Sequence, residues 1–223
     1  MITISKEDYL KAVLEAESEG DHVISATLAH RLSVSAPAVT MALRRLKRDG
    51  LVAVRADGRV ELTSAGRKVA LRTMVRHHLI ERMLAEVFGM EWYRVHDEAE
   101  RLEHAVSAEF EAKLAQKLGP AGNCPHGNPV VPERSEIRRR RGLRLLSEAE
   151  PGTTCRVSSM YERDSALLRF LDERGVRPGA QVQVLERNYD QTMTLLADKR
   201  KVSLGGPAAE KVWVAPEKKA TKH

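Results

Sequence analysis

The sequence predicts a mainly α-helical protein with small β components. Three observations carry this prediction. Apolar residues recur at helical spacing in residues 1–118, a Gly- and Pro-rich loop covers 119–132, and short apolar runs typical of strands, with one short helix, follow from Leu143 to Val214. We therefore expect three domains, at residues 1–63, 64–140 and 141–223, the last ending in a disordered basic tail, Lys218–His223.

The first 63 residues have the pattern of a winged helix-turn-helix. Apolar spacing predicts a first helix around residues 9–14, a second from Ser25 to Leu32, and a third that Ser35 caps and Gly50 follows. Asp57-Gly58 lies between two apolar runs, which is a strong hairpin signal. The order helix, turn, helix, hairpin defines the winged fold. The buried face of the third helix is expected to consist of Val39, Leu43 and Leu46.

The third helix and the hairpin carry the positive charges expected of a DNA-binding surface. A recognition helix presents its first turns to base edges, while cations hold the phosphates. A solvated basic face or a protein-interaction module would show similar charges, and loss of binding in Arg45→Ala with Arg48→Ala would exclude the latter. Small and apolar contacts favour thymine methyl groups and DNA shape over guanine. The residues expected to contact DNA are Ser35, Pro37, Ala38, Thr40, Met41, Arg45 and Arg48.

The composition describes an aliphatic core and a basic surface. Of the 223 residues, 42% are hydrophobic, 30% charged and 4% aromatic, and the formal net charge is +6. This excess permits nucleic acid or an anionic surface as partner. The chain begins with no signal-peptide pattern and contains no run of about 18 apolar residues, so we expect a cytoplasmic protein without a membrane partner. The two cysteines, Cys124 and Cys155, are expected to be reduced thiols.

Acids and histidines follow one another in the middle of the chain. A helix expected from Val95 to Phe110 places Ala99, Leu102, Val106 and Phe110 on its buried face. Side chains three or four residues apart share one face of a helix, with Cβ atoms about 5–6 Å apart. Such carboxylates and imidazoles can enclose a divalent cation or simply face water. The residues with this spacing are His96, Glu100, Glu103 and His104, and in the preceding helix His77 and Glu81.

These segments resemble the diphtheria toxin repressor family. The resemblance runs through residues 74–84, through residues 95–104 with their His-Asp-Glu-Ala and Glu-His patterns, and through Cys124-Pro125-His126. It implies a metal-dependent transcriptional repressor, not an enzyme, that binds operator DNA as a homodimer and controls metal-uptake genes. It also implies that residues 64–140 form a helical metal-binding and dimerisation domain, and that the C-terminal domain is a small SH3-like β-barrel.

The resemblance implies a primary metal site formed by Asp8, Glu100, Glu103 and His104, with His77 as a further ligand. The iron-sensing branch has methionine and cysteine at the positions of Asp8 and Glu100, whereas carboxylates there are those of the manganese-sensing branch. We therefore expect Mn²⁺, with Fe²⁺ next and other divalent metals in vitro. Lys11 stands where a two-metal version of this branch has a glutamate, which argues against a binuclear cluster.

A second site is implied with lower specificity. Its expected ligands are Glu81, Cys124, His126 and Asp164, with Glu162 as the alternative to Asp164 and His96 as an additional ligand.

Other interpretations stay open at this point. One is a winged-helix regulator that responds to a small molecule or to oxidation of Cys124 rather than to metal. Another is a metalloenzyme, which the lack of a His-Glu-x-x-His motif disfavours. The run Arg138–Arg141 is interpreted as a solvated linker, with an auxiliary contact to DNA phosphates as the alternative.

Overall fold

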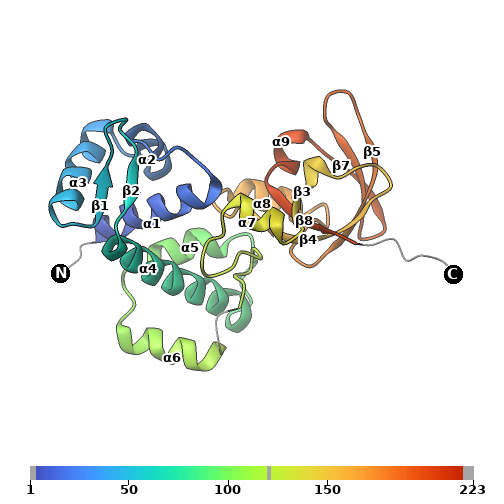
Figure 1. Ribbon diagram of the computed structural model, residues 1–223. Helices are drawn as coiled ribbons and strands as arrows, with labels where there is room; N and C mark the ends of the chain where they lie inside the picture. Colours follow the sequence, from blue (N-terminus) through green and yellow to red (C-terminus); the bar gives the residue numbers. More distant parts are fainter. Residues whose placement is uncertain (1–3, 120–121, 218–223) are drawn as a thin grey trace. The chain divides into compact units, whose positions relative to one another are not determined.

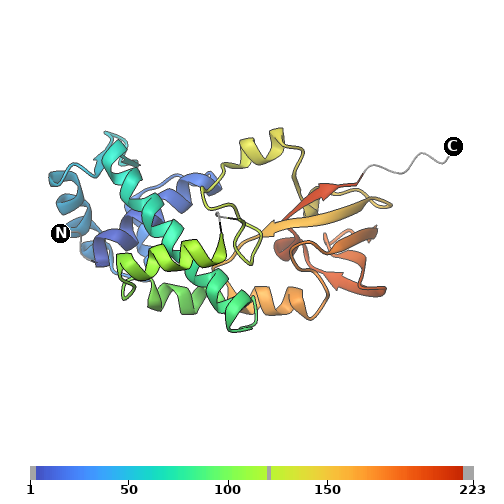
Figure 2. The ribbon, with the colours of Figure 1, turned by 90° about the horizontal axis from the view of Figure 1, so that it is seen from below.

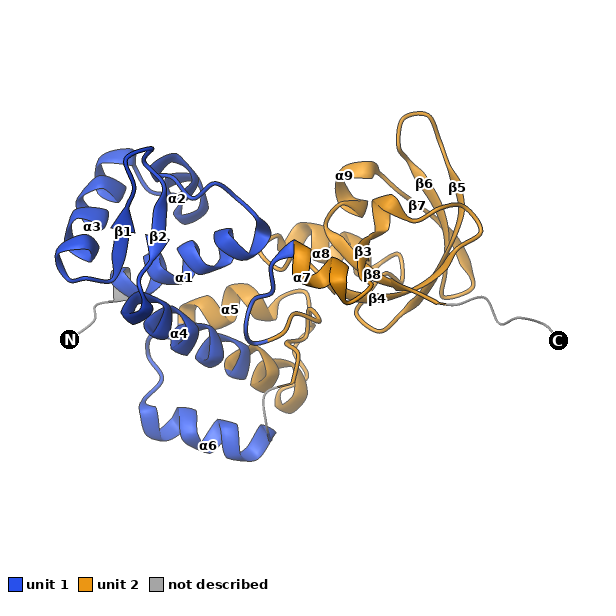
Figure 3. Ribbon diagram, viewed as in Figure 1, with its two compact units in different colours: residues 1–79, 102–121, 130–135 blue, residues 80–101, 122–129, 136–223 orange. Residues whose placement is uncertain are grey.

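The computed structural model describes residues 4–119 and 122–217 and divides into two compact units. Unit 1 comprises residues 1–79, 102–121 and 130–135, and unit 2 comprises residues 80–101, 122–129 and 136–223 (Figure 3). The predicted basic tail, Lys218–His223, lies outside the described residues. The three-domain boundaries expected from the sequence stay predictions.

Unit 1 contains the predicted winged helix-turn-helix (Figure 1). Its elements are α1 (Ile4–Glu19), α2 (Ser25–Leu32), α3 (Ala36–Arg48), β1 (Val52–Val54), β2 (Val60–Leu62), most of α4 (Ser64–Arg82) and, later in the chain, α6 (Ala108–Leu118). Helix α1 contacts α2 and β2, while α3 contacts α2 and β1. Leu10, Leu28 and Leu46 are fully buried in the core these elements share. The expected recognition helix and hairpin are therefore held in one packed body.

Helix α3 begins and packs as the sequence predicts. The Ser35 hydroxyl accepts a hydrogen bond from the backbone N–H of Ala38 at 3.4 Å, so Ser35 is the N-cap. The predicted buried face, Val39, Leu43 and Leu46, is buried. The hairpin turns at Gly58, whose φ of 82° lies in the left-handed region that glycine adopts without strain.

The single helix predicted from Val95 to Phe110 is wrong. Helix α5 (Val95–Leu102) ends first, and α6 starts after a turn. The Ser107 hydroxyl accepts the backbone N–H of Phe110 at 3.1 Å, which caps a new helix. Val106 therefore lies between the helices, and Phe110 is 44% exposed instead of lying on a buried face. Glu103 and His104 consequently occupy the turn, where helical spacing does not apply.

Unit 2 is built around an antiparallel six-stranded sheet with the order β3-β8-β4-β5-β6-β7. Its strands lie in the yellow-to-red, C-terminal part of the chain (Figure 2), which confirms the small C-terminal β domain. Register shifts after Val157 and Val184 mark bulges, which bend strands and increase twist. The core includes Val182, Leu195 and Val214. The strands are β3 (Arg144–Leu145), β4 (Thr154–Met160), β5 (Gln181–Arg187), β6 (Met193–Ala197), β7 (Arg200–Leu204) and β8 (Val212–Pro216), with helices α8 (Ser165–Asp172) and α9 (Gly206–Ala209) between them.

The linker interpretation of Arg138–Arg141 is wrong for its first residues. They lie in helix α7 (Ser135–Arg140). The Arg138 guanidinium donates to Ser159 Oγ at 2.9 Å and stacks over the Trp213 ring at 5.4 Å from its centroid. Four consecutive arginines do not indicate which of them contacts the sheet, and in the structure Arg138 does so. No helix in the described part of the chain has the length and hydropathy needed to cross a bilayer.

Candidate metal centre

Four predicted ligands lie together in unit 1. We term Asp8, His77, Glu103 and His104 the first cluster. Asp8 lies on α1, His77 on α4, and the other two residues in the turn after α5. His104 Nε2 is 2.7 Å from Asp8 Oδ1 and 3.5 Å from Glu103 Oε1. His77 Nδ1 lies 2.7 Å from Glu103 Oε2. Residues up to 96 positions apart in the sequence thus converge on one point.

Lys11 places a positive charge inside this cluster. Its side chain is only 3% exposed, and its Nζ donates to Glu103 Oε1 at 2.7 Å. The same Nζ is 3.4 Å from His77 Nδ1. Since Glu103 is also fully buried, the two form an ion pair away from water. The ammonium therefore neutralises one of the carboxylates that the sequence assigns to metal binding.

The two carboxylates of the cluster have opposite pKa shifts. Burial raises the pKa of Asp8, and the nearby His104 and Lys11 only partly offset this, while the Glu103 charge raises it further. Burial also opposes ionisation of Glu103, but the hydrogen bond from His77 and the Lys11 charge outweigh it and lower the pKa of Glu103. Glu103 is therefore held as a carboxylate, and Asp8 lacks a comparable neutralising partner.

The donor atoms of the first cluster fit a hard divalent cation. Asp8, Glu103 and His104 each offer one ligand atom, and these atoms lie within 4.8 Å of one another. Two carboxylate oxygens and one imidazole nitrogen, with no thiolate, suit Mn²⁺ or Fe²⁺ better than a soft ion. An ion there would relieve the repulsion that Glu103 exerts on Asp8.

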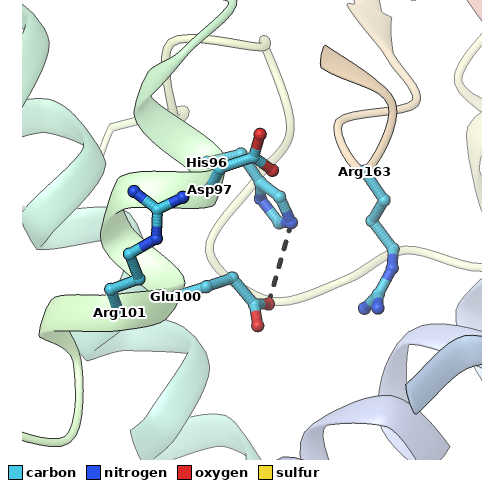
Figure 4. A pocket seen from close by; sticks show the side chains of 5 residues that line it. All are labelled: His96, Asp97, Glu100, Arg101 and Arg163. Atoms are coloured by element: carbon cyan, nitrogen blue, oxygen red, sulfur yellow. Dashed lines mark ion pairs between the residues drawn. The ribbon is translucent and has the colours of Figure 1, made fainter. Parts of the chain in front are cut away.

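Glu100, the remaining predicted primary ligand, belongs to unit 2. Its Oε1 lies 3.7 Å from His96 Nε2 on the same helix, and both residues line a polar pocket with Asp97, Arg101 and Arg163 (Figure 4). Its membership of the primary ligand set stays a prediction.

Five residues of unit 2 form a second cluster, which we define as Glu81, His96, Cys124, His126 and Glu162. Glu81 Oε1 lies 3.1 Å from His96 Nδ1 and 3.5 Å from His126 Nδ1. Cys124 Sγ lies 3.4 Å from Glu162 Oε2 and 3.7 Å from His126 Nδ1. Glu81 and His126 are completely buried. Buried carboxylate, imidazole and thiol groups at these distances offer the mixed ligands of a divalent-metal site.

The Cys-Pro-His loop is held against β4 by its backbone. The N–H of Met160 donates to the carbonyl of His126 at 3.1 Å, and Gly127 has a φ of 84°. A Cβ atom on Gly127 would lie 2.0 Å from the carbonyl oxygen of Ser158, so only glycine fits here. The Asn128 amide donates to Glu162 Oε2 at 2.6 Å. The loop thus brings its thiol and imidazole close to Glu162, two residues after the end of β4.

Of the two candidates for the last ligand of this cluster, the structure places Glu162 there and not Asp164. Asp164 is exposed and caps α8, because its Oδ1 accepts the backbone N–H of Leu167 at 2.9 Å. The structure therefore brings Glu162 rather than Asp164 into this cluster, and the identity of the ligand stays a prediction. An acidic residue just before a helix is often a cap, and that signal was present in the sequence.

The Cys124 thiol is not set up to ionise in the metal-free protein. Burial first, and then the charges of Glu162 and Glu81, raise its pKa well above the ordinary value. A nucleophilic or readily oxidised cysteine needs the opposite environment.

The predicted DNA-contacting residues share the exposed face of α3. Ser35, Pro37, Ala38, Thr40, Met41, Arg45 and Arg48 are all exposed. On the hairpin, Arg55 pairs with Glu61 at 2.6 Å and Arg59 with Asp57 at 3.6 Å. The face is basic towards the end of α3 and small or apolar in its first turns, as expected from the sequence.

Sequence reasoning missed several residues around the clusters. Glu7 Oε2 lies 3.2 Å from His104 Nδ1. Arg76 donates to the backbone carbonyl of Glu103, and the Asn128 amide donates to Glu162. The adjacent acids Glu7-Asp8 were a visible signal, but their partner lies 97 residues away from Glu7.

Family models match three consecutive parts of this chain. Residues 1–60 match the model described as iron dependent repressor, N-terminal DNA binding domain. Residues 63–132 match the iron dependent repressor, metal binding and dimerisation domain, and residues 144–216 match the FeoA domain.

Comparisons with individual proteins over most of the chain agree with these family models. The chain is 32% identical to the diphtheria toxin repressor of Corynebacterium diphtheriae, over 84% of this chain and 87% of that protein. It is 35% identical to the iron-dependent repressor IdeR of Mycobacterium tuberculosis, over 80% and 82% of the two chains. A solved manganese-dependent transcriptional repressor in complex with manganese superimposes with a TM-score of 0.84 at 34% identity, covering 95% of this chain and 100% of that one.

Proposed function

This chain belongs to the iron-dependent repressor family of metal-dependent transcriptional regulators, and from that premise we propose that it represses metal-uptake genes when it carries Mn²⁺. It is a transcriptional repressor and not an enzyme. In this proposal the protein acts in the cytoplasm as a homodimer on operator DNA, and Fe²⁺ is the competing ion.

The observation that supports the proposal is the contact between Asp8 and His104. Asp8 belongs to α1, which contacts α2 and β2 and so belongs to the body that carries α3. His104 and Glu103 belong to the segment matched by the metal-binding and dimerisation model. An ion held by all three would join these two segments and supply positive charge where two carboxylates face each other.

The choice of Mn²⁺ rests on the donor atoms. The first cluster offers oxygen and imidazole nitrogen only, which favours Mn²⁺, with Fe²⁺ next. The solved manganese-bound relative adds support from similarity. The buried ammonium of Lys11 beside Glu103 favours one ion in this cluster over two.

The second cluster is proposed as a separate metal site. Its ligands would be Glu81, Cys124, His126 and Glu162, with His96 adjoining. The presence of a thiol makes it softer than the first cluster, so Zn²⁺ and Cd²⁺ would bind here more readily than at the first cluster.

DNA recognition is assigned to α3 of each protomer. The small residues from Ser35 to Met41 would face base edges, while Arg45 and Arg48 hold phosphates. In a dimer, successive major grooves require the two α3 helices to lie about 34–36 Å apart. Restraining α1 through Asp8 would favour that spacing, and DNA would in turn tighten metal binding.

The competing redox hypothesis is disfavoured by Cys124. Its buried thiol has a raised pKa, so little reactive thiolate forms near neutral pH. A redox-regulated protein would keep its DNA affinity after treatment with a chelator.

The direct test is DNA binding of the metal-free protein titrated with Mn²⁺, Fe²⁺ and Zn²⁺. We expect Mn²⁺ to raise operator affinity in the wild type and to have little effect in Asp8→Ala or His104→Ala. Glu109→Ala, which removes an exposed carboxylate on α6, is the matched control and should respond normally. Equal DNA affinity with and without Mn²⁺ in the wild type would contradict the proposal.

A further inference from the structure

Two consecutive acids of α1 contact opposite nitrogens of one imidazole ring. Asp8 Oδ1 lies 2.7 Å from His104 Nε2, and Glu7 Oε2 lies 3.2 Å from His104 Nδ1. Only Asp8 was expected to contribute to the cluster. The ring of His104 is therefore fixed from both edges by neighbouring residues of a single helix, all within unit 1.

The two edges of the ring have different surroundings. On the Nε2 side, Glu103 Oε1 joins Asp8 at 3.5 Å, so three ligand atoms converge there. On the Nδ1 side, the guanidinium of Arg76 lies 3.6 Å from Glu7 Oε2. A carboxylate that faces an arginine is a poor place for a divalent cation, because the two positive charges repel. The Nε2 edge is thus the metal-binding edge.

Arg76 also fixes the surroundings of Glu7. Its Nε donates to Glu111 Oε2 at 3.0 Å, and its Nη1 donates to the backbone carbonyl of Glu103 at 3.2 Å. One guanidinium therefore contacts Glu7 on α1, Glu111 on α6 and the turn that carries Glu103 and His104. Glu7 is held in place rather than swinging freely in water, and its side chain is 20% exposed.

From this geometry we infer that Glu7 is a positioning residue for His104. When a cation takes the lone pair of Nε2, the neutral imidazole carries its proton on Nδ1, and Glu7 is the carboxylate placed to accept it. The lone pair used for metal binding is then on Nε2, directed towards Asp8 and Glu103. A carboxylate behind a histidine ligand also makes the imidazole a stronger donor, and loss of such a group typically weakens metal binding about 10–100-fold.

This inference rests on the proposed function, and its test separates the two. Mn²⁺ affinity is measured by electron paramagnetic resonance of the free ion for the wild type, Glu7→Gln, Glu7→Ala and Asp8→Ala. We expect binding to weaken about 10–100-fold in Glu7→Ala. Glu7→Gln, which keeps an acceptor oxygen, should fall between Glu7→Ala and the wild type. Glu109→Gln, an exposed acid of α6, should bind as the wild type does.

A spectroscopic measurement on the wild type guards against variants that fail to fold. Long-range ¹H–¹⁵N correlation of the Cd²⁺-loaded protein should show the His104 proton on Nδ1 and the metal on Nε2. Metal bound to Nδ1 would overturn the role of Glu7. So would wild-type Mn²⁺ affinity in Glu7→Ala when Asp8→Ala binds poorly, and neither result would contradict the metal site itself. Wild-type affinity in Asp8→Ala as well would overturn the metal site itself.

Discussion

At the scale of single residues, Lys11 bears on how many cations the first cluster could accept. Its ammonium lies 2.7 Å from Glu103 Oε1 with both side chains buried. This fixed positive charge would repel a second metal ion, which supports the proposal of a single ion in this cluster. The sequence shows a lysine at this position, but only the structure shows that its amine points into the cluster.

Replacing this lysine should make stability depend more strongly on Mn²⁺. In Lys11→Met the buried Glu103 loses its cation. Removing one partner of a buried ion pair lowers stability by about 3–5 kcal/mol. An ion bound to Glu103 would restore part of that loss. The increase in melting temperature on adding Mn²⁺ should therefore be larger in Lys11→Met than in the wild type.

Lys6→Met provides the matched control for this experiment. Lys6 lies on the same helix but pairs with Asp49 at the partly exposed surface, where ion pairs contribute little. Its Mn²⁺ response should equal that of the wild type. An unchanged response in Lys11→Met would show that the ammonium does not share Glu103 with the metal.

Cys124 gives a prediction about pH. Burial raises the pKa of the Cys124 thiol, so at a given pH a smaller fraction of it is thiolate than for an exposed cysteine. In metal-free Cys155→Ser protein, alkylation by iodoacetamide should be much slower than in the urea-unfolded chain throughout pH 7–9. The labelling rate is followed by mass spectrometry. Labelling of the folded protein at the unfolded rate would revive the redox hypothesis.

At the scale of elements, the sequence predicts those whose signals are local. Ser35 caps α3, and Gly58 forms the hairpin turn, because caps and turns need specific residues at the element itself. The break between α5 and α6 was missed because helical apolar spacing continues across it, although Ser107 was a local sign of a cap. Asp164, which the sequence suggested as a ligand, is the N-cap of α8 in the structure.

The loop that carries Cys124 and His126 depends on a close backbone approach. Gly127→Ala would force a Cβ atom against the Ser158 carbonyl and strain a positive φ, at a cost of about 1–3 kcal/mol. The thiol and imidazole should then move out of the second cluster. We expect reduced Co²⁺ binding, seen as loss of the thiolate-to-metal charge-transfer absorption.

Gly122→Ala is the control in the same loop, because a Cβ atom there would have nothing within 4 Å. It should keep the absorption. First-cluster Mn²⁺ affinity should survive in both variants. An unaltered charge-transfer band in Gly127→Ala would mean that this backbone approach does not position Cys124.

For the whole molecule, the sequence predicts the fold class. It also names most of the acids and histidines that the structure gathers in the two clusters, but not the residues that hold them in place. No sequence motif marks Glu7, Lys11 or Arg76. Each contacts the clusters through a partner that lies 27 to 97 residues away in the sequence. Such pairings depend on how helices pack, which no local spacing encodes. The resemblance transferred ligands position by position, and it could not transfer these contacts.

DNA binding by the assembled protein should depend on the basic end of α3. Replacing Arg45 and Arg48 together by alanine should weaken binding to all sequences. It should also reduce the slope of log affinity against log salt by about 0.9 for each phosphate that is no longer neutralised. Fluorescence anisotropy over a salt series measures both. Arg169→Ala, which removes an exposed charge from α8, should leave the slope unchanged, and a similar decrease in that variant would point to a nonspecific charge effect.

The central claim is that one cation joins α1 to the turn after α5. A crystal structure of the Mn²⁺-loaded protein with anomalous diffraction tests it most directly. The account predicts a manganese peak bonded to a carboxylate oxygen of Asp8 and to Nε2 of His104. A peak that contacts neither side chain, with Asp8 turned to solvent, would contradict it.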